Sequence, residues 1–273
     1  MGSAPRFQPY LDVPPAPFRW RLGLRPLDLA DWFVVDEHHQ VELDRKQQIL
    51  RDHHATAFQV LDGVEPEATE VLDAVLDHLG LTEDAIDPAL HPLDAAGRLV
   101  QEDLVLLVER GDRLVCGGGS VCFPNRWDLA SKIGRTMAEI HAPVAGLNDQ
   151  LEGPVDGFLA RLRPERPFWR LGWGILDTDD LYQPVDGTAT PRPTDAGPAD
   201  HHLRVERETL RRFPNTNCVL FTIRTFVCPI DAVQDPSDRS HLADAVEALP
   251  HDVAAYKQLD HVGASIAAWL RGC

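Results

Sequence analysis

The sequence lacks the marks of a membrane or secreted protein. No apolar run in its 273 residues is long enough to span a bilayer, and residues 1–15 carry prolines but no apolar signal-peptide core. Its five cysteines are an odd number without CxxC or CxxCH spacing, which argues against a disulfide framework, a zinc ribbon and covalent haem attachment. We therefore expect a cytoplasmic protein with no membrane partner.

Positive charge is also scarce. Lysine and arginine total 26 against 43 aspartates and glutamates, which gives a formal net charge of −17. Nucleic-acid binding requires basic surface to neutralise phosphates, so we expect no nucleic-acid partner. A negative surface steers cationic substrates and basic redox proteins, although solubility is the simpler explanation. The GxGxxG fingerprint of nicotinamide and flavin enzymes is absent.

Strand signals are plentiful in the chain, of which 44% is hydrophobic. Apolar runs and two-residue alternation indicate five strands. They cover residues 104–108, 114–123, 168–176, 203–210 and 218–230. Three successive glycines, 117–119, predict a β-bulge or a close backbone approach in the second of these strands.

Helical periodicity indicates helices between and around these strands. They cover residues 41–62, 67–79, 128–140, 155–162 and 253–270. Asp128 would cap the third helix, and Pro143 would keep it from continuing past His141. Gly80 would stop the second helix. Two strands, helices and then three strands predict an α+β fold.

We expect one large domain with extensions, divided into three parts. An N-terminal arm with helices that pack on the core covers residues 1–90, the central domain 91–235, and a C-terminal helical extension 236–273. The arm is predicted to lie over the domain, because its tryptophans and phenylalanines need burial. Residues 177–201 are rich in proline, glycine and aspartate, and they predict a lid or a disordered, protease-sensitive loop.

Several blocks of the chain are similar to one bacterial family. In order, they are His91-Pro92-Leu93, Cys122-Phe123-Pro124, Lys132-Ile133-Gly134, Ile140-His141-Ala142-Pro143-Val144, Arg204-Val205-Glu206-Arg207-Glu208, Phe221-Thr222-Ile223-Arg224 and Tyr256-Lys257. Together they resemble the alpha subunits of haem-dependent oxidative N-demethylases. The resemblance implies a PAS-like antiparallel sheet with helices on one side, a b-type haem, oxygen chemistry at a small amine, and electrons from an external reductase as redox partner.

His141 is the candidate axial ligand of the haem iron, because a neutral imidazole binds iron through one ring nitrogen. A histidine at a helix end is more often structural, and the resemblance is what favours ligation. Two rivals remain open. His91 lies in a matching block, and the Cys228-Pro229 step could supply a thiolate, although a buried strand cysteine is the commoner state.

Charged residues on the late strands are candidates for the rest of the site. Arg204, Glu206 and Glu208 alternate and so share one face of their strand. We expect Glu206 to hold a cationic amine or guanidinium, Arg204 to bind the cofactor, and Arg224 to pair with bound oxygen, a propionate or a substrate carboxylate. The alternative is a solvent-facing ion-pair ladder, which we favour for Glu208.

One departure from the family bears on the substrate. The chain has Arg170-Leu171-Gly172-Trp173 where the N-demethylases have an asparagine in place of the glycine. The missing side chain opens space, so a larger substrate than dimethylamine is expected. The best match is then to members of the family that oxidise L-arginine in D-cycloserine biosynthesis, with N-hydroxylation to N-omega-hydroxyarginine as the reaction. The alternatives are N-demethylation of a small amine, a haem-based gas or redox sensor, and a binding protein without haem.

Overall fold

A single antiparallel sheet organises the computed structural model, which describes residues 7–12, 17–185 and 197–272. In the described residues it has seven strands in the order β1-β5-β6-β7-β3-β4-β2. Their bounds are Arg25–Pro26 (β1), Phe58–Val60 (β2), Asp103–Arg110 (β3), Arg113–Ser120 (β4), Phe168–Leu176 (β5), His202–Arg212 (β6) and Val219–Pro229 (β7). The predicted PAS-like α+β class is confirmed.

All five predicted strands are present as β3 to β7, and the sequence missed only the short edge strands β1 and β2. The predicted bulge is also present. The β3–β4 register shifts between Leu106 and Leu107, which leaves Gly117 as the extra residue on β4. A Cβ on Gly117 would lie 2.7 Å from Cγ2 of Val108, so glycine is required by the close approach.

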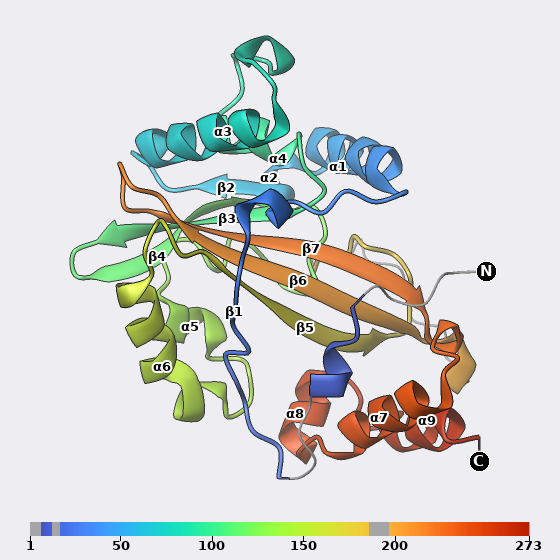
Figure 1. The fold of residues 1–273 in the computed structure, drawn as a ribbon. Coiled ribbons are helices and arrows are strands. Elements are labelled where there is room, and N and C mark those ends of the chain that lie inside the picture. The colour runs from blue at the N-terminus through green and yellow to red at the C-terminus, as the bar shows by residue number, and fades with distance from the viewer. Residues whose placement is uncertain (1–6, 13–16, 186–196, 273) are drawn as a thin grey trace.

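Helices cover both faces of the sheet (Figure 1), whereas we had expected them on one side. Their bounds are His39–Asp52 (α1), His54–Ala57 (α2), Glu65–Leu79 (α3), Pro92–Gly97 (α4), Met137–His141 (α5), Leu147–Arg161 (α6), Pro236–Glu247 (α7), His251–Tyr256 (α8) and Gly263–Leu270 (α9). Strand β3 shows why both faces need cover. Leu104 and Leu106 join the core under α3 and α4, and Val105 and Leu107 join the core beside α5 and α6.

Four predicted helices are wrong in extent. The first, 41–62, ends at Asp52 in α1, with α2 and strand β2 in its remainder, and the fourth, 155–162, begins earlier as α6, at Leu147. Residues 128–136 form turns because Gly134 adopts a φ of +75° and Thr136 pairs with Val115 of β4, so α5 begins only at Met137. The C-terminal helix is divided by Gln258, whose φ is +59°, into α8 and α9 after a separate α7. Local periodicity does not report either backbone reversal.

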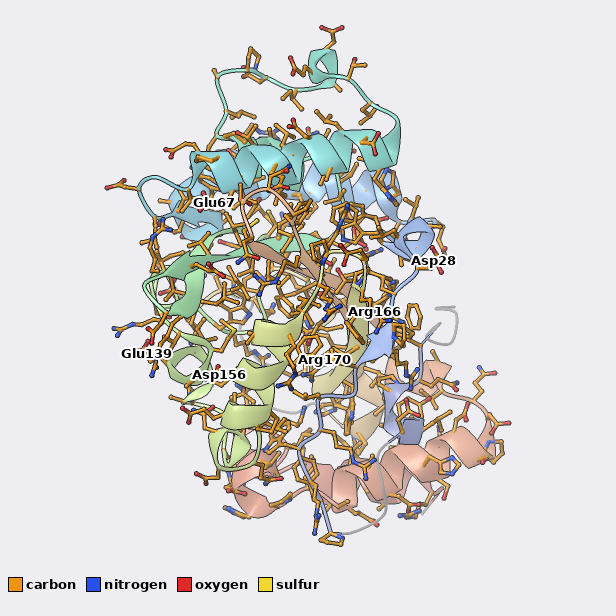
Figure 2. All side chains as sticks on the ribbon, turned by 60° about the vertical axis from the view of Figure 1, so that its left-hand side comes forward. Asp28, Glu67, Glu139, Asp156, Arg166 and Arg170 are labelled. Atoms are coloured by element: carbon orange, nitrogen blue, oxygen red, sulfur yellow. The ribbon has the colours of Figure 1, made fainter. Side chains whose placement is uncertain are left out.

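The arm lies over the domain as predicted, within the part that the structure describes. Strand β1 pairs with β5, and Trp32 is fully buried. Arg207 of β6 donates to the backbone oxygens of Asp31 and Trp32 at 2.7 and 3.2 Å. Side chains fill the space between the sheet and its helices (Figure 2). The predicted loop 177–201 includes residues 186–196, which lie outside the described residues. None of the helices described is long and apolar enough to cross a membrane.

Candidate functional site

A cavity of about 680 Å³ lies on the α5–α6 side of the sheet, within the range typical of ligand pockets. Its apolar wall comes from the sheet and from α5, α6 and the chain between them. This wall includes Val105, Leu107, Phe221, Ile223, Met137, Ile140, Val144 and Phe158. The arm contributes Trp20, whose indole N–H donates to the backbone oxygen of Ala145 at 2.9 Å. The cavity is therefore closed partly by a segment distant in sequence.

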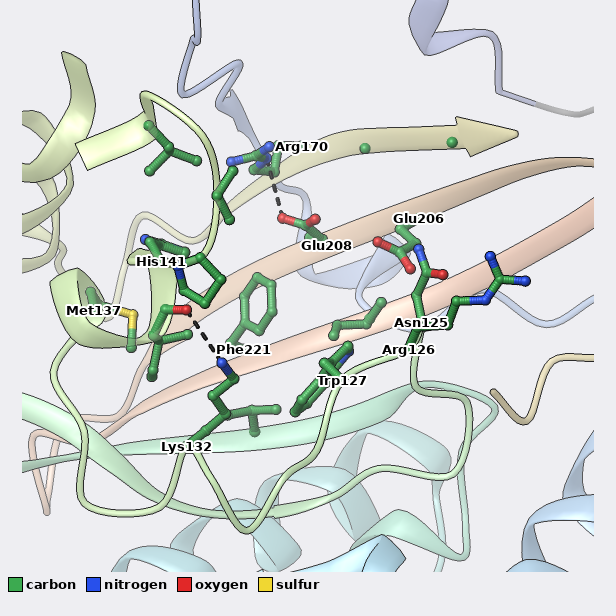
Figure 3. Close-up of a pocket in the computed structure, with 18 of the residues that line it drawn as sticks. Asn125, Arg126, Trp127, Lys132, Met137, His141, Arg170, Glu206, Glu208 and Phe221 are labelled. Carbon is green, nitrogen blue, oxygen red and sulfur yellow. Dashed lines mark hydrogen bonds and ion pairs between the residues drawn. The ribbon is translucent and has the colours of Figure 1, made fainter. Parts of the chain in front are cut away.

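His141 enters the cavity from the last turn of α5 (Figure 3). Within the described part of the chain its ring has no hydrogen-bond partner. Burial lowers the pKa of His141, and the positive charges of Arg170 and Lys132 lower it further. A neutral imidazole with an unused nitrogen lone pair is the form that ligates a metal. The predicted ligand thus lies where a cofactor could reach it.

Neither rival ligand lines this cavity. His91 caps α4, where its Nδ1 accepts the Leu93 N–H at 3.2 Å. Cys228 packs in the apolar cluster beneath α7 and α9, and burial raises the pKa of its thiol to about 11. A protonated thiol is not the ligating form. Of the three candidates, the structure brings only His141 to the cavity.

Opposite His141, β5 and β6 form a charged wall (Figure 3). Arg204 Nε lies 2.8 Å from Glu206 Oε1, and Arg170 Nε lies 3.2 Å from Glu208 Oε2. The three β6 residues share one face, as the alternation predicted. Glu208 differs from our expectation, because its side chain is only 15% exposed and lines the cavity. Burial raises the pKa of Glu208, against the opposing effect of Arg170.

Arg224 is not part of this wall. Its side chain is fully buried on the other face of the sheet, where its guanidinium lies 2.7 Å from Asp36 and 2.8 Å from Glu42. On β7 the cavity is lined by residues 221 and 223, and the next residue, Arg224, points away. Arg224 therefore does not lie where it could pair with bound oxygen, a propionate or a substrate carboxylate in this cavity, as we had expected. Arg224 instead ties the arm and α1 to the sheet.

Cationic groups outnumber carboxylates along the cavity. Arg204 keeps a buried Nη1 without a hydrogen-bond partner. Lys132 Nζ lies 3.5 Å from the backbone oxygen of Ile140, and Lys257 Nζ donates to the backbone oxygen of Trp173 at 2.7 Å. We had predicted no role for Lys132 or Lys257. Both lie in blocks that resemble the family, and that was the signal that could have singled them out.

Two glycines form the floor in front of the acidic residues. On β5, Gly172 is paired with Glu206 and Gly174 with Arg204. A Cβ on Gly172 would lie 3.3 Å from Oε1 of Glu208, and a Cβ on Gly174 would meet nothing within 4 Å. The open space in front of the charged wall therefore lies at Gly174, whereas at Gly172 the Glu208 carboxylate already approaches the backbone closely.

Comparison with known families agrees with this geometry. Residues 23–84 and 78–267 match the family described as haem-dependent oxidative N-demethylase, alpha subunit-like. The chain belongs to this family. Haem-dependent oxidation is the chemistry that the family's name states. The matched residues include the whole sheet, α8 and most of the residues that line the cavity.

The residues of the cavity fit a haem. His141 offers one nitrogen ligand, the apolar wall suits a porphyrin, and unneutralised cations suit its propionates. His141 would hold the iron. Lys132, whose charge reaches His141, would neutralise a propionate, as would the unpartnered Nη1 of Arg204.

Proposed function

We propose that this member of the family is a haem-dependent monooxygenase that N-hydroxylates L-arginine to N-omega-hydroxyarginine, as in antibiotic biosynthesis. The observation that carries the proposal is a neutral, unpartnered His141 in a largely apolar cavity that faces the carboxylates of Glu206 and Glu208. When bound, b-type haem supplies the binding and reductive activation of O2, with electrons from an external reductase. The chain's own residues supply substrate position and a dry site.

The reaction balances as a monooxygenation. Transfer of one oxygen atom of O2 to a guanidine nitrogen consumes two electrons and two protons, and it yields hydroxyarginine and water. Glu206 holds the guanidinium by charge-assisted hydrogen bonds. Arg204 orients Glu206 from a fixed position, because its Nη2 also donates to Phe123 O at 2.6 Å and to Thr225 Oγ1 at 3.1 Å. The apolar wall around Phe221 keeps water from the reacting nitrogen.

Two features favour an amino acid over a simple alkylamine. The cavity of about 680 Å³, with open space at Gly174, suits a substrate larger than dimethylamine. The wall also mixes both charge signs, since Glu206 and Glu208 lie among Arg170, Arg204 and Lys257. A zwitterionic substrate can satisfy both signs, whereas an alkylammonium satisfies only one.

N-demethylation of a small amine is the second candidate, and the family match favours it. The same residues would then hold an ammonium with its methyl group towards the haem, and oxidation of that carbon would release formaldehyde. A peroxide-driven assay separates the two, because hydrogen peroxide supplies the oxygen atom and both electrons. A 16 Da mass increase of L-arginine supports hydroxylation. Formaldehyde from dimethylamine supports demethylation. Haem binding without either product indicates a sensor.

The ligand assignment is tested by His141→Ala. We expect the variant to lose stoichiometric haem binding or to show a strongly shifted Soret band, because no rival ligand lines the cavity. His91→Ala is the matched control. It removes the cap of α4 and lowers stability by about 0.5–2 kcal/mol, but it should leave the Soret band unchanged. The opposite pattern, with haem lost in His91→Ala and retained in His141→Ala, would overturn the assignment.

A further inference from the structure

Lys257 is a cation in the cavity that lacks a counter-ion. It follows α8, and its side chain lies against β5, with Nζ 2.7 Å from the backbone oxygen of Trp173 and 5.2 Å from the centroid of the Trp173 ring. An ammonium has three N–H donors, and this hydrogen bond uses one. Within the described chain, no carboxylate lies within the 4.0 Å of an ion pair with Lys257.

The neighbouring carboxylates are already engaged by arginines. Glu206 is paired with Arg204, and Glu208 with Arg170. This end of the cavity therefore holds three cations and two carboxylates, in a protein whose formal net charge is −17. A partly buried cation is stabilised by an anionic partner, and within the residues that the structure describes no carboxylate is in ion-pair contact with Lys257.

Titration of Lys257 is consistent with this environment. Burial lowers its pKa to about 8, Arg170 contributes in the same direction, and Glu206 and Glu208 oppose the shift. An anion bound beside Nζ would reverse part of that shift, because an opposite charge favours the ammonium form.

We propose that Lys257 forms a carboxylate-binding subsite at the α8 end of the cavity, which takes the carboxylate of an amino-acid substrate. The proposal rests on the function proposed above and deepens it. Glu206 takes the cationic end of the substrate, and Lys257 takes the anionic end with the two N–H donors that Trp173 leaves unused. A haem propionate has the same chemistry as the substrate carboxylate, so the experiment must separate the two sources.

The test compares L-arginine with agmatine, the same molecule without its carboxylate. Both are titrated into the haem-loaded protein at pH 7, where Lys257 is largely protonated, and the haem spectrum reports binding. We expect the wild type to bind L-arginine about 10- to 100-fold more tightly than agmatine, as a charge-assisted hydrogen bond implies. Lys257→Gln keeps a donor for the Trp173 oxygen but removes the charge. It should weaken the binding of L-arginine but not of agmatine, so that the ratio of the two affinities falls to about one. Lys257→Arg should restore part of the preference for L-arginine.

A second measurement examines the propionates. Haem and its dimethyl ester, which lacks carboxylates, are bound to wild type and Lys257→Gln. If Lys257 holds a propionate, Lys257→Gln weakens the binding of haem but not of the ester, and the ratio of the affinities for L-arginine and agmatine stays unchanged. The carboxylate-binding subsite then stands, but the carboxylate that it binds belongs to the cofactor. If Lys257→Gln changes neither comparison, the subsite is wrong. If the wild type responds to neither arginine nor agmatine, the proposed substrate fails, and the haem comparison alone decides the role of Lys257.

Discussion

At the scale of single residues, alternation along β6 makes Arg204 and Glu206 point to the same side of the sheet, and both line the cavity that His141 enters from α5. Arg224 was assigned to the same pocket although it lies on another strand. Which residues of β7 face Glu206 depends on the register between the strands, where Glu206 is opposite Thr225 and Arg224 opposite Arg207. One strand's sequence does not contain that register.

Glu206 gives the sharpest prediction at this scale. Glu206→Gln removes the charge that we assign to the substrate cation, while Arg204 stays anchored by Phe123 and Thr225. We expect haem content to be retained and the affinity for both L-arginine and agmatine to fall about 10- to 100-fold, in line with a lost charge-assisted hydrogen bond.

Substrate titrations of the haem spectrum measure this effect, and Lys257→Gln is the matched comparison. The lysine variant should affect arginine alone, because agmatine has no carboxylate. Glu206→Gln should affect both ligands. Unchanged affinities in Glu206→Gln would show that Glu206 does not contact the substrate, even though it lines the cavity.

At the scale of elements, the sequence was most reliable where a stretch is long and periodic. Strand β5 and helix α3 match their predicted ends within two residues. The region 128–140 failed because its apolar residues, including Leu129 and Ile133, pack in the core under α5 without forming a continuous helix. Their burial produced a helix-like pattern, while pairing of Thr136 with Val115 determined the backbone. Pairing between distant segments overrides local propensity.

The start of α5 is therefore a point of control for the haem ligand. The helix has five residues, and its capping box joins the Thr136 hydroxyl to the Glu139 N–H and the Glu139 carboxylate to the Thr136 N–H. Such a short helix is not stable by itself. Thr136→Ala should lower the free energy of unfolding by about 0.5–2 kcal/mol and speed haem dissociation several-fold, because His141 lies at the other end of α5.

Urea unfolding and transfer of haem to an acceptor protein measure the two effects. Thr136→Ser retains the capping hydroxyl and should behave as the wild type. Thr69→Ala removes a threonine hydroxyl from α3, where it bonds to the Glu65 backbone oxygen, and should leave haem dissociation unchanged. Equal dissociation rates in the alanine and serine variants of Thr136 would contradict a role for the cap in holding His141.

At the scale of the whole molecule, the two faces of the sheet have different roles. The α3–α4 face buries Arg224 with Asp36 and Glu42, and this network anchors the arm and α1. The other face leaves the cavity open between the sheet and α5–α6. The guanidinium of Arg224 is thus fully engaged on the α3–α4 face, whereas on the cavity face Arg204 keeps an Nη1 without a partner. Composition could not reveal this division, because it depends on which elements cover which face.

The stability of the folded protein at acid pH depends on buried histidines on both faces of the sheet. Burial lowers the pKa of His78, His91 and His141 below the usual 6.5. The unfolded chain therefore takes up protons first as the pH falls below 6.5, and each histidine contributes stability that is full above that value and is lost as the pH falls towards its folded pKa. The three histidines therefore contribute a loss of stability to the haem-free protein between pH 7.5 and pH 5.5.

Other titratable groups also make the stability depend on pH. Glu42 and Glu208 have raised pKa values from burial, so their protonation favours the folded state as the pH falls towards the usual carboxyl range. Acidification also relieves the repulsion of a net charge of −17.

The histidine contribution must therefore be measured as a difference between proteins. Urea unfolding of wild type and of the double variant His78→Gln/His141→Gln at both pH values provides it. The wild type should lose more stability on acidification than the variant, and equal losses would mean that these two histidines titrate alike in the folded and unfolded chains.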